Sequence, residues 1–121
     1  MHASSQQQTF IQDYALGDII FEEGQRGSDM FVVLSGAVDL YRRHGQNGSS
    51  RLASLAQGEM FGEMALITEG PRMASARASA PGTRLIRIDQ ARFVYLTSQQ
   101  PAFALSVMRV LAQRLAKTSQ D

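Results

Sequence analysis

The chain has 121 residues and a mass of 13.3 kDa, which suits one domain with one hydrophobic core. It contains no cysteine, so disulfides, thiolate nucleophiles and cysteine-based zinc sites are excluded. Hydrophobic residues make up 44% and charged residues 19%, which is typical of a folded chain and not of a disordered one. The net charge of +1 gives no electrostatic indication of a nucleic-acid partner.

The first eight residues are polar and carry no signal-peptide pattern, and no 18-residue apolar run occurs. We therefore expect a flexible tail over residues 1–8, a single domain over 9–121, a cytoplasmic location and no membrane association. His2 and His44 are the only histidines, too few for a multi-histidine metal centre. No metal, no catalytic cofactor and no enzymatic activity are expected.

Short apolar runs separated by glycines predict a mainly β fold between Thr9 and Ile88. Several runs alternate, as where Val38 and Leu40 flank Asp39, and such strands bury one face. An antiparallel β-roll, or double-stranded jelly roll, over residues 9–88 is favoured because it hides strand edges. The predicted strands are Thr9–Tyr14, Asp18–Glu23, Met30–Ser35, Ala37–Arg43, Arg51–Gln57, Met73–Ala80 and Arg84–Ile88.

After Ile88 the apolar period changes to that of a helix, and two C-terminal α-helices are predicted over residues 89–119. Asp89 is the expected N-cap of the first helix, and Pro101 begins the second. The apolar arc of the second helix is wider than one contact needs. We expect this helix, over 101–118, to pack on the sheet and against a second copy or a partner protein; complete burial within its own domain remains the alternative.

The segment between Gly58 and Ala78 contains the candidate binding residues. Gly62 precedes a run of helix formers, and a helix beginning near Glu63 would direct free N–H groups towards an anion. Arg72 opens a predicted strand, where a buried guanidinium needs a counter-charge. A bound phosphate would supply one, with Glu63 accepting from a sugar hydroxyl; a structural Glu63–Arg72 salt bridge is the alternative.

These segments resemble the cyclic nucleotide-binding domain family, which includes the bacterial catabolite activators and the regulatory subunits of cyclic-AMP-dependent kinase. The resemblance covers nearly the whole chain. It rests on three segments: residues 17–24, the run MFVVLSG at 30–36, and a phosphate-binding cassette formed by Phe61–Leu66 with Arg72–Ala74. It implies a regulatory sensor that binds a cyclic nucleotide and transmits the event through its C-terminal helices.

The resemblance also implies a role for each cassette residue. Gly62 and Glu63 would contact the ribose, with Glu63 taking the 2′-hydroxyl. Met64 and Ala65 would donate backbone N–H groups, and Arg72 would bind the cyclic phosphate.

Three further positions follow from the same resemblance. Ala74 would flank the phosphate, and Thr118, with Ser119, would reach the adenine. Met73 departs from the family, which often has serine or threonine there. Because that hydroxyl is one contact for a guanine amino group, its loss favours cyclic AMP over cyclic GMP.

Two other functions remain open. A degenerate roll would act as a dimerisation or protein-interaction module without nucleotide. A second possibility is the sensor part of a transcription regulator that lacks its DNA-binding domain. No helix-turn-helix follows Asp121, so this chain alone is not expected to bind DNA.

Overall fold

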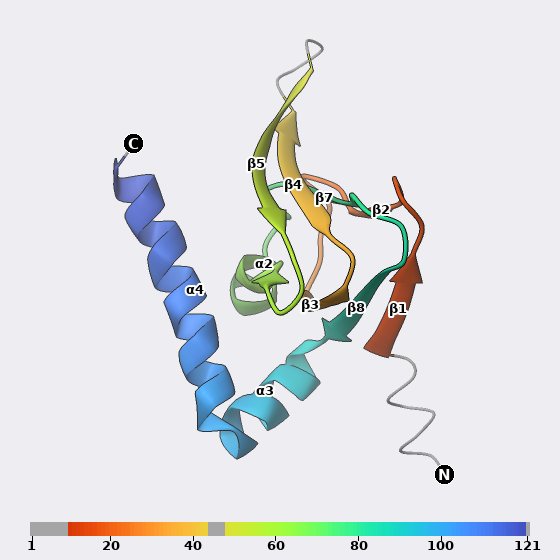
Figure 1. The fold of residues 1–121 in the computed structure, drawn as a ribbon. Coiled ribbons are helices and arrows are strands. Elements are labelled where there is room, and N and C mark those ends of the chain that lie inside the picture. The colour runs from red at the N-terminus through yellow and green to blue at the C-terminus, as the bar shows by residue number, and fades with distance from the viewer. Residues whose placement is uncertain (1–9, 44–47, 121) are drawn as a thin grey trace.

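The computed structural model describes residues 10–43 and 48–120, with the side chains of 117–120 left out. Figure 1 shows two layers of antiparallel strands with α2 beside them and two further helices at the C-terminal end. The strands are β1 (Ile11–Tyr14), β2 (Ile19–Phe21), β3 (Met30–Ser35), β4 (Val38–Arg43), β5 (Ser49–Leu55), β6 (Met60–Phe61), β7 (Ser75–Ala78) and β8 (Thr83–Ile88). The helices are α2 (Glu63–Thr68), α3 (Gln90–Gln99) and α4 (Pro101–Gln120).

The strands form two four-stranded sheets, in the orders β1-β8-β3-β6 and β2-β7-β4-β5. Every strand pairing is antiparallel. The predicted β-roll followed by helices is therefore confirmed. The short strand β6 was not predicted, because two residues are too few to show a period; it pairs with β3, placing Phe61 opposite Phe31.

The strand predicted from Met73 begins only at Ser75, so Arg72 lies ahead of β7 and not within it. The backbone around Arg72 is instead held by the turn between β2 and β3. Arg72 N–H donates to the Gln25 carbonyl at 2.9 Å, and Gly24 N–H donates to the Arg72 carbonyl at 2.8 Å. These bonds satisfy the backbone of Arg72 outside the sheet.

The main core lies between the two sheets and is centred on three phenylalanine rings. Phe21 comes from one sheet, while Phe31 and Phe61 come from the other. The ring centroids of Phe31 and Phe61 lie 5.2 Å apart, and each lies 5.9 Å from that of Phe21. Aromatic rings at such distances attract one another by more than the burial of their surface alone provides. The three rings therefore stabilise the packing of the two sheets.

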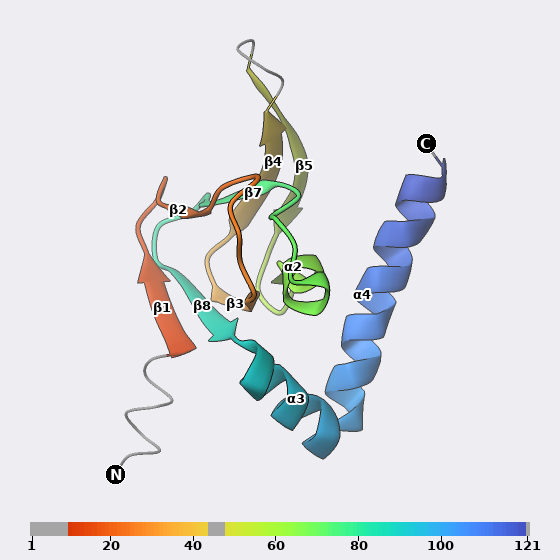
Figure 2. The same ribbon diagram turned by 180° about the vertical axis from the view of Figure 1, so that it is seen from behind.

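The helices are positioned by specific local residues. Gly62 precedes α2 with a φ of 81°, a left-handed conformation that favours glycine. Asp89 caps α3 as predicted, since its carboxylate accepts from the N–H of Arg92 at 2.8 Å. Pro101 begins α4 as predicted. Both views show α2 between the roll and α4 (Figures 1 and 2).

A second apolar cluster joins α2 and α4 to the roll. Its buried members are Met30, Leu66, Ile88 and Val107, with Phe103 and Leu111 of α4 packed against them. Other apolar residues of α4 remain uncovered: Leu105 is 45% and Met108 57% exposed. The structure thus covers only part of the wide apolar arc. No helix in the described part of the chain combines the length and apolarity needed to cross a bilayer.

Candidate functional site

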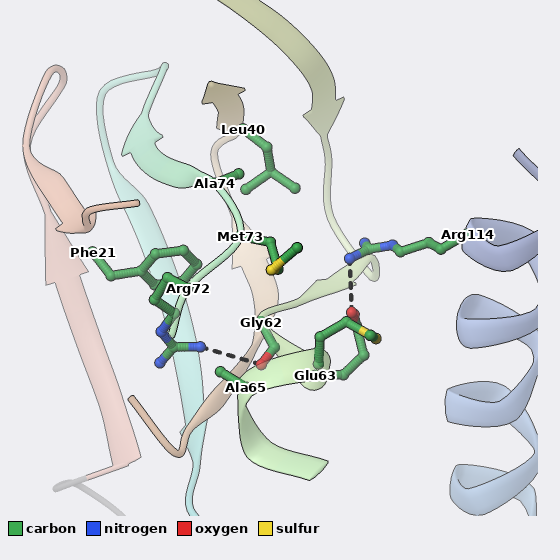
Figure 3. A pocket seen from close by; sticks show the side chains of 10 residues that line it. Phe21, Leu40, Gly62, Glu63, Ala65, Arg72, Met73, Ala74 and Arg114 are labelled. Carbon is green, nitrogen blue, oxygen red and sulfur yellow. Dashed lines mark hydrogen bonds and ion pairs between the residues drawn. The ribbon is translucent and has the colours of Figure 1, made fainter. Parts of the chain in front are cut away.

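A pocket lies between α2, the segment after Pro71, and the inner faces of β2 and β4. It encloses about 360 Å³, including the part open to solvent, and Arg114 of α4 closes one side (Figure 3). The pocket is lined by Phe21, Leu40, Gly62, Glu63, Met64, Ala65, Arg72, Met73, Ala74 and Arg114.

Arg72 is buried at one end of the pocket, with only 6% of its surface exposed. Its Nη1 donates to the backbone carbonyls of Asp29 at 2.7 Å and Gly62 at 3.2 Å. The guanidinium carbon lies 4.1 Å from the centroid of the Phe21 ring. Carbonyls and a ring offset only part of the cost of burying a full charge, so Arg72 retains affinity for an anion.

Burial lowers the pKa of Arg72 below its ordinary value, while the negative charges of Asp29 and Glu63 oppose this shift. Arginine nevertheless stays protonated in proteins. The Arg72 side chain in the pocket is therefore positively charged. Among the described residues it forms hydrogen bonds only with neutral carbonyl groups, and the carboxylates of Asp29 and Glu63 act on it without direct contact.

Glu63 begins α2 and is completely buried. Its Oε2 accepts from Nη1 of Arg114 at 2.7 Å, and Nη2 of Arg114 donates to the Met60 carbonyl at 3.3 Å (Figure 3). Its other oxygen, Oε1, is buried without a hydrogen-bond partner among the described residues. A buried acceptor without a hydrogen bond destabilises the folded protein, and a ligand that donates a hydrogen bond to Oε1 would remove this cost.

Burial raises the pKa of the Glu63 carboxyl above its ordinary value. The charge of Arg114, the backbone N–H groups of Glu63 and Met64, and the charge of Arg72 each act in the opposite direction. Burial thus favours the neutral form of the Glu63 carboxyl, whereas the neighbouring positive charges and N–H groups favour its charged form.

The structure corrects the suggested Glu63–Arg72 salt bridge. Glu63 pairs with Arg114 of α4, and Arg72 bonds to backbone carbonyls. The physical reason is that Gly62 and the turn at Asp29 hold Arg72 on the far side of the pocket from the Glu63 carboxylate (Figure 3). The two side chains therefore interact only through the electrostatic field.

The predicted site residues largely come together. Seven line the pocket: Gly62, Glu63, Met64, Ala65, Arg72, Met73 and Ala74. Phe61 lies beneath it, fully buried in the ring cluster. Met73 is 61% exposed at the rim. Thr118 belongs to α4, but its side chain lies outside the described residues, and His2 and His44 are likewise outside them.

Phe21, Leu40 and Arg114 line the pocket but were not predicted to do so. Arg114 could have been found from its place on α4. It follows the packed residues Val107 and Leu111 at helical spacing, so it lies on the buried stripe and needs a counter-charge there.

The family model described as "Cyclic nucleotide-binding domain" matches residues 11–100 of this chain. The cyclic AMP receptor protein of Thermus thermophilus is 38% identical over 108 residues, which is 89% of this chain and 50% of that protein. The chain therefore spans half the length of this relative. The regulatory subunit of cAMP-dependent protein kinase from Mycosarcoma maydis is 29% identical over 109 residues, covering 88% of this chain and 19% of that protein.

Solved structures show the same likeness. The catabolite activator protein of Thermus thermophilus superposes with a TM-score of 0.82 at 32% identity, covering 98% of this chain and 56% of that chain. The EAL enzyme Bd1971 matches in two forms. Its cAMP-bound form has a TM-score of 0.68 at 32% identity, covering 89% of this chain and 29% of that one. Its cGMP-bound form has a TM-score of 0.69 at 33% identity, covering 91% and 29%.

Proposed function

The chain belongs to the cyclic nucleotide-binding domain family, and we propose that it is a regulatory sensor that prefers cyclic AMP to cyclic GMP. The domain spans residues 9–121 in this proposal, with the roll over 9–88 as the binding part and the helices over 89–119 as the output. The cytoplasm is the proposed location. The observation that carries the proposal is that one pocket holds both a buried guanidinium with no carboxylate partner and a buried carboxylate oxygen with no donor, among the residues that the structure describes.

The proposed division of labour follows from charge. Arg72 binds the cyclic phosphate, since a guanidinium suits phosphate oxygens and no carboxylate of the described residues pairs with it. Glu63 Oε1 accepts from the ribose 2′-hydroxyl, which supplies the missing hydrogen bond. Gly62 lets the ribose approach the backbone, and the N–H groups of Met64 and Ala65 face the phosphate.

The base is proposed to lie towards the rim of the pocket. Met73 and Leu40 offer it an apolar surface, Ala74 flanks the phosphate, and Phe61 supports the cassette from below. Thr118 is proposed to reach the base from α4. Because Met73 has no hydroxyl for the guanine amino group, cyclic AMP is the preferred ligand.

Signal transmission is proposed to run through Glu63. Its Oε2 is bonded to Arg114 of α4, while its Oε1 would be bonded to the ligand. Nucleotide binding would therefore change the electrostatic surroundings of the Glu63–Arg114 ion pair, which joins the roll to α4. Couplings of this kind amount to about 1–3 kcal/mol.

Calorimetric titration of the full chain with cyclic AMP and cyclic GMP tests this function. We expect saturable binding of both and tighter binding of cyclic AMP. Tighter binding of cyclic GMP would overturn the base assignment only. Absence of heat with millimolar amounts of either nucleotide would favour the interaction module described above.

A second role is supported by α4. Its exposed residues Leu105 and Met108 would be covered if the helix packed against α4 of a second copy. We therefore include homodimerisation through residues 101–118 in the proposal.

A further inference from the structure

A second cavity lies on the opposite side of Arg72 from the nucleotide pocket. It contains about 620 Å³ of empty space, including the part open to solvent, between β1, β2, the β2–β3 turn and β8. Arg72 and Phe21 line both cavities and so form the partition between them. We call it the back cavity; its polar lining includes Gln12, Tyr14, Arg26, Asp29, Arg72 and Arg87.

One side of the Arg72 guanidinium lies against the back cavity. A Cβ atom placed on Gly27 would lie 2.5 Å from Nε and 2.7 Å from both Cζ and Nη2, so Gly27 packs closely against this side of the guanidinium. Gly27 lines the back cavity and is absent from the lining of the nucleotide pocket. Only Nη1 donates to a described residue, which leaves the Nε–Nη2 fork open on this side.

The charge of the back cavity favours an anion. Arg26, Arg72 and Arg87 line it, and Asp29 is the only carboxylate among the described lining residues. That carboxylate is already used, since its Oδ2 accepts from Nη1 of Arg87 at 2.7 Å. The guanidinium groups of Arg26 and Arg72 therefore have no carboxylate partner in the part of this cavity that the structure describes.

The remaining lining is suited to a compact oxyanion. Gly27 leaves the fork of Arg72 accessible, because a larger residue would occupy the space directly before it. The Tyr14 hydroxyl donates to Oε1 of Gln12 at 2.7 Å, which leaves the Gln12 amide N–H₂ group able to donate to an anion. Paired guanidinium groups are the preferred ligands of phosphate.

We propose that the back cavity is a second ligand site, which binds a small phosphate-bearing anion between Arg72 and Arg26 and thereby competes for the guanidinium that the nucleotide needs. The binding step stands independently of the proposed function, and the competition rests on it. An anion at the back would draw the Arg72 guanidinium towards the back cavity, whereas the cyclic phosphate would draw it towards the nucleotide pocket. Because coupling between two sites is reciprocal, nucleotide would equally weaken anion binding.

Direct binding is tested without nucleotide, by following the backbone amide and arginine Nε–H resonances of the full chain during titration with inorganic phosphate. Chloride at matched ionic strength is the control. We expect shifts at Gly27 and at Nε–H of Arg72 and Arg26. Shifts confined to Glu63, Met64 and Ala65 would place phosphate in the nucleotide pocket and overturn the proposal, as would the same shifts with chloride.

Arg26→Gln tests the site, and Arg51→Gln is the matched control. Arg26 is exposed, so the variant should fold, while Arg51 lies on β5 at the opposite edge of its sheet from β2. For a phosphate Kd of about 5 mM, 10 mM phosphate should raise the apparent Kd for cyclic AMP about threefold in the parent and in Arg51→Gln. In Arg26→Gln the rise should be less than about 1.5-fold, with unchanged cyclic AMP affinity in the absence of phosphate.

The outcomes separate the two proposals. Equal competition by phosphate in the parent and in Arg26→Gln would mean that phosphate binds only at the nucleotide site, and the back cavity would be rejected. If no cyclic nucleotide binds but the phosphate shifts at Gly27 persist, the proposed function fails and the back site stands. Glycerol 3-phosphate, titrated in the same way, distinguishes a phosphorylated metabolite from free phosphate as the preferred ligand.

Discussion

Arg114 and Glu63 are 51 residues apart in the sequence, yet Nη1 of the arginine lies 2.7 Å from Oε2 of the glutamate. The carboxylate is fully buried, whereas 35% of the arginine side chain is exposed. The pair therefore joins the interior of the binding pocket to the outermost helix. No other ion pair among the described residues links α4 to the roll.

Substitution of Arg114 alone should destabilise the domain more than substitution of Arg114 together with Glu63. Arg114→Met leaves a buried carboxylate without its counter-charge, and we expect a loss of about 2–4 kcal/mol in the free energy of unfolding. Glu63→Gln combined with Arg114→Met should recover at least half of that loss. Urea denaturation measures both; additive losses in the double variant would show that the pair contributes no coupling.

Glu63 should make stability depend on pH in a definite direction. Burial raises the pKa of Glu63 in the folded protein above its ordinary value of 4.5, so the folded protein binds the proton more tightly than the unfolded chain. The contribution of Glu63 to stability therefore falls as the pH rises from about 4.5 towards the raised pKa. We expect the parent to lose stability relative to Glu63→Gln across this window, measured by urea denaturation at several pH values. A parallel pH profile for the two proteins would contradict the raised pKa.

Arg72 should dominate nucleotide affinity. Arg72→Ala removes the proposed phosphate ligand, and cyclic AMP binding should weaken by about 2–5 kcal/mol in calorimetry. Thermal stability without ligand should change little or rise, because the guanidinium is buried and pairs with no carboxylate in residues 10–43 or 48–116. Arg72→Lys should restore only part of the affinity, since an ammonium lacks the planar fork. Equal affinity in parent and alanine variant would place the phosphate elsewhere.

Gly27→Ala tests whether the space around Arg72 matters. The added Cβ would lie 2.5 Å from Nε of Arg72 and must displace the guanidinium. We expect cyclic AMP affinity to change by about 1–2 kcal/mol, with a small change in melting temperature because a flexible side chain can move aside. Gly70→Ala is the control: its Cβ would meet only Thr68 Oγ1, at 3.3 Å. A similar change in cyclic AMP affinity in both variants would show that the space left by Gly27 beside Arg72 does not matter for binding.

The exposed face of α4 should set the oligomeric state. Met108 is 57% exposed on this helix, and Met108→Glu places a charge on the proposed contact with a second copy. We expect sedimentation velocity to show a dimer for the parent and a monomer for the variant. Gln113→Glu on the same helix is the charge control. A monomeric parent would reject the dimer and leave nucleotide binding unaffected.

Patterns within the sequence predicted the roll because alternation and glycine spacing are local properties of strands. They also predicted the cap at Asp89 and the helix start at Pro101, which depend on single residues. They could not locate β6, whose existence depends on its partner β3. The same limit made Met73 the predicted start of a strand that begins at Ser75, since the turn at Gln25 holds Arg72 out of the sheet.

For the site, the cassette was predicted because its two segments, Phe61–Leu66 and Arg72–Ala74, lie close together in the sequence and resemble the family's motif. The partner of Glu63 was not, because that pairing depends on how α3 redirects the chain and brings α4 back beside α2 (Figure 2). Proximity in sequence favoured Arg72 as the partner, whereas the fold brings Arg114 to the carboxylate. Charge alone shows that a buried arginine needs an anion, but only the tertiary structure shows which one it meets.

The rings of Phe21, Phe31 and Phe61 also determine where movement can occur. They bridge both sheets directly beneath Arg72, and a close-packed interior has low compressibility. If a ligand displaces Arg72, the packed rings therefore resist movement on that side. In the proposed signalling, movement is therefore expected on the side formed by α2 and α4, at the C-terminal end of the molecule, and not within the roll.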